Sequence, residues 1–458
     1  MSDQDHIPTT FVVSNRLPIT IHQLSDKQYD FVPSSGGLVG ALHALSQSTN
    51  FKWYGWPGVE VPEQDQQLVK EELSKRDAVP VFLGTQLADK HYNGFSNKIL
   101  WPLLHYQMHE IRLSRPDWEA YQEVNRYFAE ALLPELRAGD AVWIQDYHLL
   151  LLPSFLRQAL NKCEKDVKIG FFLHTVFPSS DFLRILPVRE DILGGLLNCD
   201  LVGFHNSDYT NHFLQSCQKT MHLEVSNCEV KYEGRSVRVI TCPIGIDPEE
   251  FHARLNLPKV QDRIKVLHKR YEDVKLIVSV DRLDYVKGIP LRMEAMEALL
   301  TKHPEHIGKV VLLQVLIPSR EAVQGYRHLH HQIDESISRI NGKFGDIEYS
   351  PIQSQFCSVS KDELTALYAA SDACIISSTR DGFNVVSLEY IACQRDRLGV
   401  LLLSEFAGAA AVLDDCIKFN PWDTDKFSKA IHQAVTMDEE EKRQRFNQLQ
   451  SFVMRNTR

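Results

Sequence analysis

The sequence lacks the features that mark several classes of protein. Its 458 residues hold 50 Lys and Arg against 60 Asp and Glu, so the net charge of −10 argues against a nucleic-acid partner. Nine cysteines lie scattered from Cys163 to Cys416 with no Cys-x-x-Cys pair, which predicts reduced thiols in the cytoplasm and no disulfide framework or zinc site. Apolar runs such as Leu149 to Leu152 are too short to span a bilayer. The polar, acidic start, Met1 to Asp5, predicts no signal peptide.

Internal repeats and low-complexity segments are also missing, and short apolar runs alternate with longer amphipathic ones. This rhythm predicts an α/β protein with parallel sheets covered by helices. Strands are expected at Thr10–Val13, Ala141–Ile144, Lys168–Leu173, Leu201–Phe204 and Val310–Leu316, and a helix at Leu38–Leu45. A terminal helix is expected to start at Glu439 and to bury one face, because the apolar Phe446, Leu449, Phe452 and Val453 recur at three- and four-residue steps. The pattern breaks at Thr241–Pro248, where prolines and a glycine cluster. We therefore expect two Rossmann-like domains, residues 1–245 and 246–458, that face each other and bind ligands between the carboxyl ends of their sheets.

One cationic segment follows a predicted buried strand in the second domain. The run Lys275–Val278 is apolar, Arg282 and Lys287 come shortly after it, and a helix is expected to begin at Ile289. Cations beside a strand end and a helix N-terminus suit a diphosphate, which Arg can grip in a fork and Lys as a point charge. An alternative remains open at this point, in which both are surface cations paired with Asp281 and Asp284.

A second segment of the same kind follows the predicted strand Ala373–Ser378. Gly382 allows close backbone approach to a ligand, and the N–H groups of Phe383, Asn384 and Val385 are expected to open a helix. The carboxylates of Asp381 and Glu389 accept hydrogen bonds, as sugar hydroxyls require. The plainer interpretation is an ordinary helix start with an Asp in its first turn.

Together these segments resemble the trehalose-6-phosphate synthases, a family of retaining glycosyltransferases. The run Tyr54–Gly58 is most similar to that of fungal members. The resemblance covers nearly the whole chain and follows the family's order. It rests on Asp281–Gly288, Arg380–Val386, Ser14–Pro18, Ser35–Leu38, Tyr54–Gly58, Leu100–Pro102, Gln145–Leu149, Phe172–Thr175, Gly203–His205 and Ser404–Gly408. It implies a GT-B fold and transfer of glucose from UDP-glucose to glucose 6-phosphate.

The resemblance also implies roles for individual residues. Those expected to bind the donor are Gly36, Gly37, Arg282, Lys287, Asp381, Gly382, Phe383, Asn384, Val385 and Glu389. Those expected to contact the acceptor are Arg16, Trp56, Tyr92, Trp101, Asp146 and Arg320. His174 is placed against the transferred glucose, donating to a hydroxyl, and is grouped as catalytic with Arg282, Lys287 and Asp381. By residue type alone, Arg16 would be a surface cation, the aromatics core residues, His174 a core histidine and Asp146 a helix cap.

No metal-ligand constellation is found in the sequence, and no cofactor is expected. Arg282 and Lys287 would neutralise the departing diphosphate in place of a cation. The resemblance implies front-face attack, with the departing phosphate taking the acceptor's proton. As partners it suggests a trehalose-phosphate phosphatase or regulatory subunits, and self-association is compatible with it; nucleic acid and membrane are not expected.

Three places depart from the family pattern. His105–Ile111 lacks a Pro-Gly, Ser350–Phe356 replaces a stretch richer in His near the nucleotide base, and the strap that returns to the first domain looks truncated at Arg458. The second leaves the uracil contacts around Gln353–Phe356 open. The truncated end and the altered segments together favour one alternative, a catalytically weak regulatory subunit of a trehalose-synthesising complex. Another alternative is a related sugar-nucleotide transferase with a different acceptor.

Overall fold

The structure is a computed structural model that describes residues 6–25, 28–33, 49–108, 111–318 and 324–457. The chain divides into two compact units, Met1–Pro243 and Ile244–Arg458. Each is built on a sheet that is wholly or mainly parallel, so the predicted α/β class with two parallel-sheet domains is confirmed. Among the helices in the described ranges, none combines the length and the apolar character that a membrane span needs. Gly36, Gly37, Arg320 and the helix expected at 38–45 lie outside the described residues.

The sheet of the first unit has nine strands in the part of the chain that the structure describes. Their order is β5 (Ala78–Pro80), β4 (Phe51–Trp56), β1 (Thr10–Arg16), β6 (Ala141–Gln145), β7 (Lys168–Phe172), β8 (Leu201–Phe204), β11 (Arg235–Thr241), β10 (Glu229–Tyr232) and β9 (Val225–Ser226). All pairs are parallel except those made by β10. Strand β1 is central, and Phe11 to Asn15 are buried along it, as expected for a strand covered on both faces.

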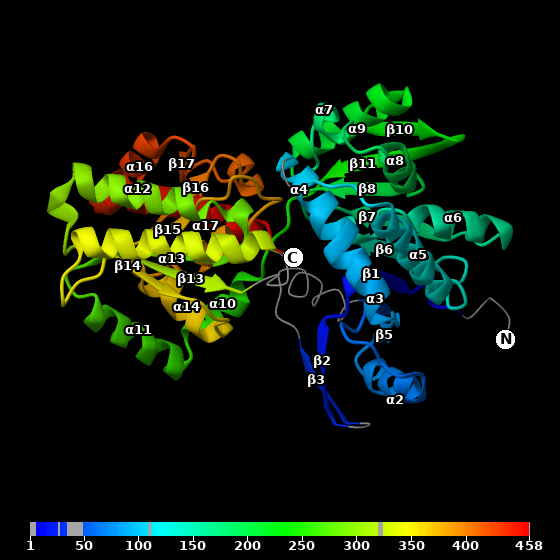
Figure 1. The fold of residues 1–458 in the computed structure, drawn as a ribbon, viewed down its shortest axis with the longest axis horizontal. Coiled ribbons are helices and arrows are strands. Elements are labelled where there is room, and N and C mark those ends of the chain that lie inside the picture. Colours follow the sequence, from blue (N-terminus) through cyan, green and yellow to red (C-terminus); the bar gives the residue numbers. More distant parts are fainter. Residues whose placement is uncertain (1–5, 26–27, 34–48, 109–110, 319–323, 458) are drawn as a thin grey trace. The chain divides into compact units, whose positions relative to one another are not determined.

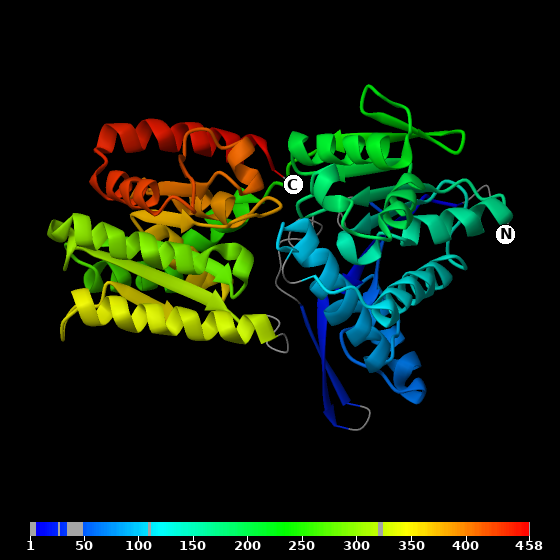
Figure 2. The ribbon, with the colours of Figure 1, turned by 45° about the horizontal axis from the view of Figure 1, so that its top comes forward.

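Helices follow most of these strands. They are α2 (Glu63–Ser74), α3 (Thr85–Asp89), the π-helix η2 (Lys90–Leu100), α4 (Trp101–Leu104), α5 (Arg115–Leu132), η4 (Tyr147–Leu149), α6 (Leu152–Lys162), α7 (Ser180–Leu183), α8 (Arg189–Leu197) and α9 (Ser207–Met221). Helix α4 follows η2 without a break, and the two helices carry Tyr92 and Trp101. A separate hairpin of β2 (Ile19–Ser25) and β3 (Gln28–Pro33) extends from this unit, drawn in dark blue in Figure 2.

The sheet of the second unit has six parallel strands within the described ranges. Their order is β14 (Ile352–Gln355), β13 (Val310–Ile317), β12 (Lys275–Arg282), β15 (Ala373–Ile376), β16 (Val400–Ser404) and β17 (Ile417–Phe419). The chain starts at the centre with β12, builds outward to β14, and then crosses back to add β15 on the other side. The strand order therefore reverses between β12 and β15, and such a switch point is where open α/β sheets bind ligands at the carboxyl ends of the strands.

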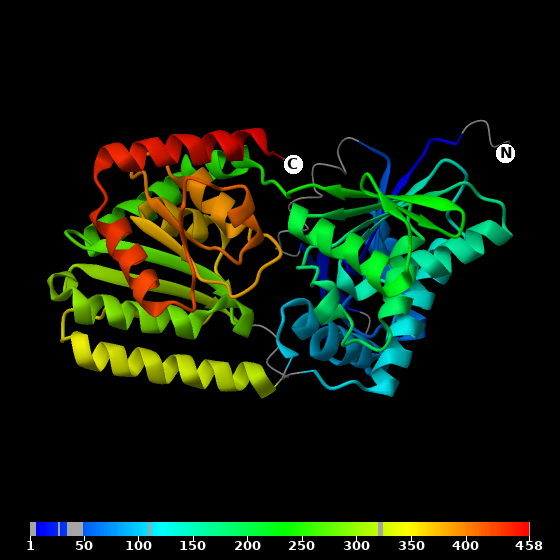
Figure 3. The same ribbon diagram turned by 90° about the horizontal axis from the view of Figure 1, so that it is seen from above.

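Alternating side chains divide the core of this unit into two layers. On β12, Leu276, Val278 and Val280 pack into one cluster, whereas Ile277 packs into the other. Because successive strand residues point to opposite faces, an uninterrupted apolar run fills both layers. The first cluster includes residues of α14 (Lys361–Ala370), α15 (Val386–Cys393) and α17 (Glu439–Arg455), and the second includes residues of α12 (Ile289–Lys302) and α16 (Thr424–Thr436). Figure 1 labels these helices, and Figure 3 shows α17 and α13 (Gln324–Phe344) on opposite sides of the sheet.

The remaining helices are short connections or edge helices. They are α10 (Pro248–Leu255), α11 (Pro258–Arg270), η5 (Tyr285–Lys287), η6 (Pro304–His306) and η7 (Gly408–Ala411). The predicted terminal helix is confirmed as α17, which buries Phe446, Leu449 and Val453 on one face and is capped by Asp438. Directly after it, Thr457 forms a bridge to Ile246. The end of the described chain is thus tied to the segment that opens this same unit.

Two predicted element boundaries were wrong. Strand β1 was expected to end at Val13, with Arg16 in the turn after it, but it runs on to Arg16, whose backbone pairs with Trp56 beyond a register shift. Helix α15 begins at Val386, with Val385 as its N-cap residue. Phe383 and Asn384 consequently belong to the preceding loop, where Asn384 adopts a positive φ of 82° that a helix does not accept.

Candidate functional site

The residues predicted to bind a donor diphosphate gather at the carboxyl edge of the second sheet. Strands β12 and β15 are hydrogen-bonded neighbours, so the loops that follow them meet. Lys287 at the end of η5 places its Nζ 2.6 Å from Asp381 Oδ2. Ser378 Oγ and Asn384 Nδ2 donate to the same carboxylate oxygen, over 3.0 and 2.9 Å. Two segments that look unrelated in sequence therefore form one polar cluster.

The surroundings of Asp381 keep it ionised. Burial alone would raise the pKa of this carboxyl, but the charge and hydrogen bond of Lys287, with the bonds from Asn384 and Ser378, lower it to about 2. A carboxylate at neutral pH is an acceptor for hydroxyl donors. The cluster thus offers both a cation and an anion to a ligand.

A buried arginine stabilises this edge of the sheet through hydrogen bonds. Arg292 on α12 is fully buried and donates to Asp281 Oδ2 over 2.5 Å and to Ser377 Oγ over 3.0 and 2.8 Å. Ser377 Oγ in turn donates to the carbonyl of Lys287 over 2.9 Å. Because a buried charge is stable only when it is paired and hydrogen-bonded, this network restrains the backbone that carries Lys287.

The turn between Lys287 and α12 requires glycine. Gly288 has a φ of +61°, and a Cβ atom at that position would lie 2.1 Å from the carbonyl oxygen of Ser377. Thr379 N also donates to the Val286 carbonyl over 2.8 Å. The loop after β15 and the turn before α12 therefore touch through backbone, with no room for a side chain between them.

Arg282 lies at the end of β12 with 43% of its side chain exposed. Its Nη2 is 4.0 Å from Asp284 Oδ2, and the buried Asp284 also accepts from the N–H of Val286. Of the alternative in which both cations pair with Asp281 and Asp284, the structure shows this 4.0 Å approach of Arg282 to Asp284. Lys287 pairs with Asp381 instead, and Asp281 pairs with Arg292.

The remaining predicted donor residues line the loop and helix that follow Asp381. Gly382 lies close to the loop that contains Gly408. A Cβ atom added to Gly408 would be 2.0 Å from the carbonyl oxygen of Gly382. Phe383 is 3% exposed and packs into the core, while Val385 is partly buried against the same cluster. Glu389 on α15 is half-buried, and Tyr368 OH donates to it over 3.5 Å. Backbone and carboxylate, not the Phe383 ring, are what this segment presents to a ligand.

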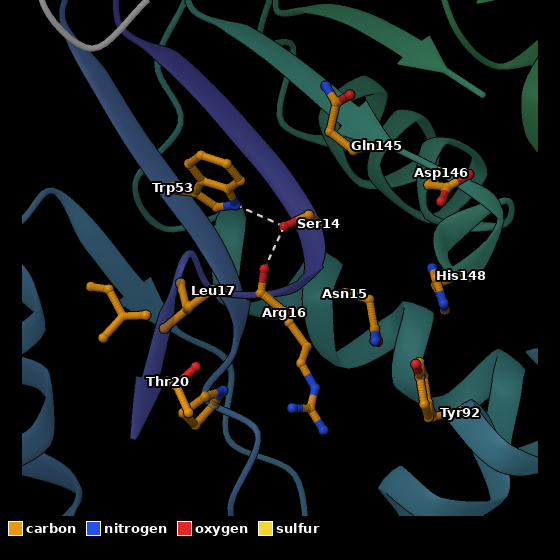
Figure 4. A pocket seen from close by; sticks show the side chains of 12 residues that line it. Ser14, Asn15, Arg16, Leu17, Thr20, Trp53, Tyr92, Gln145, Asp146 and His148 are labelled. Atoms are coloured by element: carbon orange, nitrogen blue, oxygen red, sulfur yellow. Dashed lines mark hydrogen bonds between the residues drawn. The ribbon is translucent and has the colours of Figure 1, made fainter. Parts of the chain in front are cut away.

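A separate pocket of about 290 Å³ lies in the first unit, at the carboxyl ends of β1 and β6. Its lining residues are Ser14, Asn15, Arg16, Leu17, Ile19, Thr20, Trp53, Pro57, Tyr92, Gln145, Asp146 and His148. In Figure 4, Arg16 and Asn15 extend in the same direction from the end of β1, with Tyr92 and His148 beside them. The Arg16 guanidinium lies 4.8 Å from the Trp56 ring and 5.9 Å from the Tyr92 ring. A cation held between aromatic rings suits an anionic sugar, whose ring can also stack there.

Asp146 and His174 lie at the ends of the adjacent strands β6 and β7. Asp146 adopts a positive φ of 69°, unusual for Asp, and accepts from the His174 N–H over 3.3 Å. His174 Nε2 is 2.9 Å from Gln145 Oε1, and the Gln145 amide nitrogen donates to the Trp143 carbonyl. This network assigns the proton to His174 Nε2 and leaves Nδ1 as an acceptor. Burial lowers the pKa of His174 to about 4, so the imidazole is neutral near pH 7.

Trp56 and Trp101 do not line this pocket. Trp56 borders it through Arg16, whereas Trp101 is 6% exposed and its ring packs 4.0 Å from His105 and 5.7 Å from Tyr147. Their contacts with an acceptor stay predictions.

Four residues that shape the pocket of the first unit or the Lys287–Asp381 cluster of the second unit were not predicted from the sequence. Asn15, Gln145 and His148 line the pocket of the first unit, and Arg292 holds the cluster of the second unit. The first three stood inside motifs that were recognised, but only as neighbours of the expected residues. Arg292 had its own signal, because a charged residue occupies a helical position between the apolar Ile289 and Met296.

Known proteins resemble this chain in sequence and in structure. A family model described as Glycosyltransferase family 20 matches residues 8–458. The UDP-forming alpha,alpha-trehalose-phosphate synthase of Botryotinia fuckeliana is 53% identical over 447 residues, which cover 97% of this chain and 86% of that protein. A UDP-forming synthase from Burkholderia xenovorans in complex with glucose 6-phosphate has a TM-score of 0.85 and 29% identity, covering 98% and 96% of the two chains. The N-terminal domain of Candida albicans trehalose-6-phosphate phosphatase has a TM-score of 0.89 and 32% identity, covering 100% and 95%. The chain belongs to glycosyltransferase family 20.

Proposed function

We propose that this chain transfers glucose from UDP-glucose to glucose 6-phosphate with retention, giving α,α-trehalose 6-phosphate and UDP. The observation that carries the proposal is the joining of Lys287 and Asp381 beside Arg282 at the switch point of the second sheet. A nucleotide sugar needs cations for its diphosphate and acceptors for its hydroxyls, and this edge supplies both. The similar proteins named as UDP-forming trehalose-phosphate synthases support the choice of substrates.

Lys287 and Arg282 act on the departing diphosphate. Negative charge accumulates on UDP as the glycosidic bond breaks, so cations already in place stabilise the transition state more than the ground state. The Arg292 network and the Gly288 turn hold Lys287 in position before substrate arrives. Asp381, with Glu389, accepts hydrogen bonds from the transferred glucose or the ribose. No metal or other cofactor is part of this proposal.

Arg16 binds the phosphate of the acceptor in the pocket of the first unit. Tyr92 and Trp56 flank its guanidinium, and Asp146 lies across the pocket as an acceptor for sugar hydroxyls. Trp101 and Arg320 complete the acceptor contacts that the resemblance implies.

His174 orients the transferred glucose in this scheme. Its Nε2–H is engaged by Gln145, so Nδ1 accepts a hydrogen bond from a glucose hydroxyl, in contrast to the donor role that the resemblance implies. The neutral imidazole adds no charge beside the forming cationic sugar. The acceptor attacks from the face that UDP leaves, and the departing phosphate takes the proton of the attacking hydroxyl.

The proposal extends to surroundings and partners. All nine cysteines are unpaired, which fits the reducing cytoplasm where both substrates would be met. A trehalose-phosphate phosphatase is the expected partner enzyme, because it would consume the product.

An assay of UDP release tests the proposal. Purified chain with UDP-glucose should release UDP when glucose 6-phosphate is added, and much less with glucose or fructose 6-phosphate. NMR of the product should show two anomeric carbons joined in α,α linkage. Equal release with all three acceptors would refute the assigned acceptor.

A second candidate is a regulatory subunit with weak catalysis. It is favoured by the similarity to the N-terminal domain of a protein named for phosphatase activity, since this shows that the fold is not confined to proteins named as synthases. The retention of Arg16, His174, Arg282, Lys287 and Asp381 weighs against it. The same assay decides: UDP release no faster than for the Lys287→Ala variant would favour the regulatory role.

A further inference from the structure

Three histidines and a glutamate gather in the second unit, away from the residues discussed so far. His303 is the C-cap residue that follows α12, Glu305 and His306 belong to η6, and His432 lies on α16. Helix α12 runs from the carboxyl end of β12 back to the start of β13, so this group lies at the amino edge of the sheet. Lys287 and Asp381 lie at the carboxyl edge. The group therefore takes no part in the proposed transfer.

The side chains of this group face one another. His306 Nε2 lies 2.9 Å from His432 Nδ1, and His303 Nδ1 lies 3.1 Å from Glu305 Oε1. One ligand atom from each of the four residues lies within 4.8 Å of every other. His306 is buried, His303 and His432 are half-buried, and Glu305 is exposed. Such a gathering is a donor set, because three imidazoles and a carboxylate are ligands that Zn²⁺ takes.

We propose that His303, Glu305, His306 and His432 bind one divalent transition-metal ion of the zinc class. Two ligands about 2.0–2.1 Å from a tetrahedral ion lie roughly 3.3 Å apart, so the two close pairs need to open by only a few tenths of an ångström. The hydrogen bond between His306 and His432 is replaced by two bonds to the metal. The rings of His303 and His432 are stacked at 3.9 Å and 15°, so one of them must turn to aim its nitrogen at the ion.

The number and kind of ligands favour a structural role. Four protein ligands leave no open position, which is typical of a structural and not a catalytic zinc site. The ion would fasten α16 to the connection between α12 and β13.

Binding of Zn²⁺ and Co²⁺ to the chelator-treated full chain tests the proposal. We expect one Zn²⁺ per chain by calorimetry, a rise in the unfolding temperature, and a visible absorption band of tetrahedral Co²⁺. His306→Ala and His432→Ala should each weaken Zn²⁺ binding by more than about 100-fold, the upper end of what losing a ligand's supporting hydrogen bond costs. UDP release should not change with Zn²⁺ in either direction, because the site and the donor edge are at opposite ends of the sheet.

His331→Ala is the matched control, since His331 is another histidine beside a carboxylate, 3.3 Å from Glu335 on the surface of α13. It should leave Zn²⁺ binding unchanged. Equal binding by wild type and the His306 and His432 variants would overturn the proposal, as would a thiolate-to-Co²⁺ charge-transfer band, which would assign the metal to cysteine. If the variants only lower stability, and do so equally with and without Zn²⁺, the group is a packing cluster and the proposal fails.

Discussion

Lys287 Nζ and Asp381 Oδ2 lie 2.6 Å apart, although the two residues are separated by 94 positions. The pair joins the loops after β12 and β15, and the pKa of Asp381 falls to about 2 partly because of Lys287, although burial opposes the shift. Lys287 is therefore already paired with a carboxylate before any phosphate binds. A bound diphosphate would share it with Asp381, and the carboxylate would keep the Lys287 side chain directed at the edge of the sheet.

We predict that Arg282→Ala lowers turnover about 10²–10³-fold, as loss of a preorganised transition-state contact does. Stability should change by less than about 1 kcal/mol, because Arg282 is 43% exposed and its contact to Asp284 is long. UDP release and thermal unfolding measure the two effects. Lys302→Ala is the control, as Lys302 is 41% exposed and pairs with Asp425. Near wild-type turnover in Arg282→Ala would remove Arg282 from the mechanism.

Lys287→Ala should lower turnover by a similar factor and also destabilise the fold, because it leaves the Asp381 carboxylate without its cation. The double variant Lys287→Ala with Asp381→Asn should recover most of the unfolding temperature but none of the turnover. Recovery of activity in the double variant would show that Lys287 serves only to pair Asp381.

Arg16→Ala should weaken glucose 6-phosphate binding while UDP binding stays intact. A hydrogen bond to a charged group contributes roughly 1.5–3 kcal/mol, so the affinity should fall about 10–100-fold. Calorimetric titration with each ligand separates the two. Arg76→Ala is the control, because Arg76 also lies over an aromatic ring in this unit, 5.8 Å from that of Phe31, but outside the pocket. Equal loss of both ligands would mean that Arg16 is structural.

Turnover should survive treatment with EDTA unchanged. The cations that face the donor are Arg282 and Lys287, and neither depends on a metal to hold its place. The same treatment should lower the unfolding temperature if the histidine group holds Zn²⁺. An absolute requirement for Mg²⁺ or Mn²⁺ in the UDP-release assay would contradict the donor-site assignment.

Stability should fall as the pH is lowered from about 6.5 to about 4. Burial lowers the pKa of His174 to about 4, and it lowers that of His91 to about 4 although His91 Nε2–H donates to the His148 carbonyl, which opposes the shift. Above pH 6.5 both histidines are neutral in the folded and unfolded chain, whereas between these values only the unfolded chain takes up the protons. Each can contribute up to about 3 kcal/mol to the fall. In urea unfolding at several pH values, His174→Gln should reduce the slope and the exposed His331→Gln should not.

Gly288→Ala should destabilise the second unit by about 3 kcal/mol or more and lower turnover, because the new Cβ would meet the Ser377 carbonyl oxygen at 2.1 Å. Gly308→Ala is the matched control, since Gly308 also has a positive φ, of 80°, but no atom within 4 Å of an added Cβ. It should cost only the backbone strain, about 1 kcal/mol. Equal losses would mean that φ and not the close contact sets the requirement for glycine.

The local pattern predicted much of the fold for a physical reason. Apolar runs such as Lys275–Val278 and Val310–Leu316 could be recognised as buried strands because both faces of a central parallel strand need apolar side chains. The terminal helix was recognised from Phe446, Leu449 and Val453, whose spacing matches one helical face. Arg282 and Lys287 could be placed at a strand end because that position follows from the order of elements alone.

Tertiary structure decided which of these residues meet. The sequence by itself determined the α/β class, the strand-end position of the cations and the family resemblance, all of which depend on neighbours within a few residues. Only the fold decided that Lys287 pairs with Asp381, that Arg292 anchors Ser377, and that Gln145 fixes the proton of His174. Such contacts depend on the order of strands in a sheet and on the register between them, and no periodicity along the chain encodes the distance between residues brought together by a crossover.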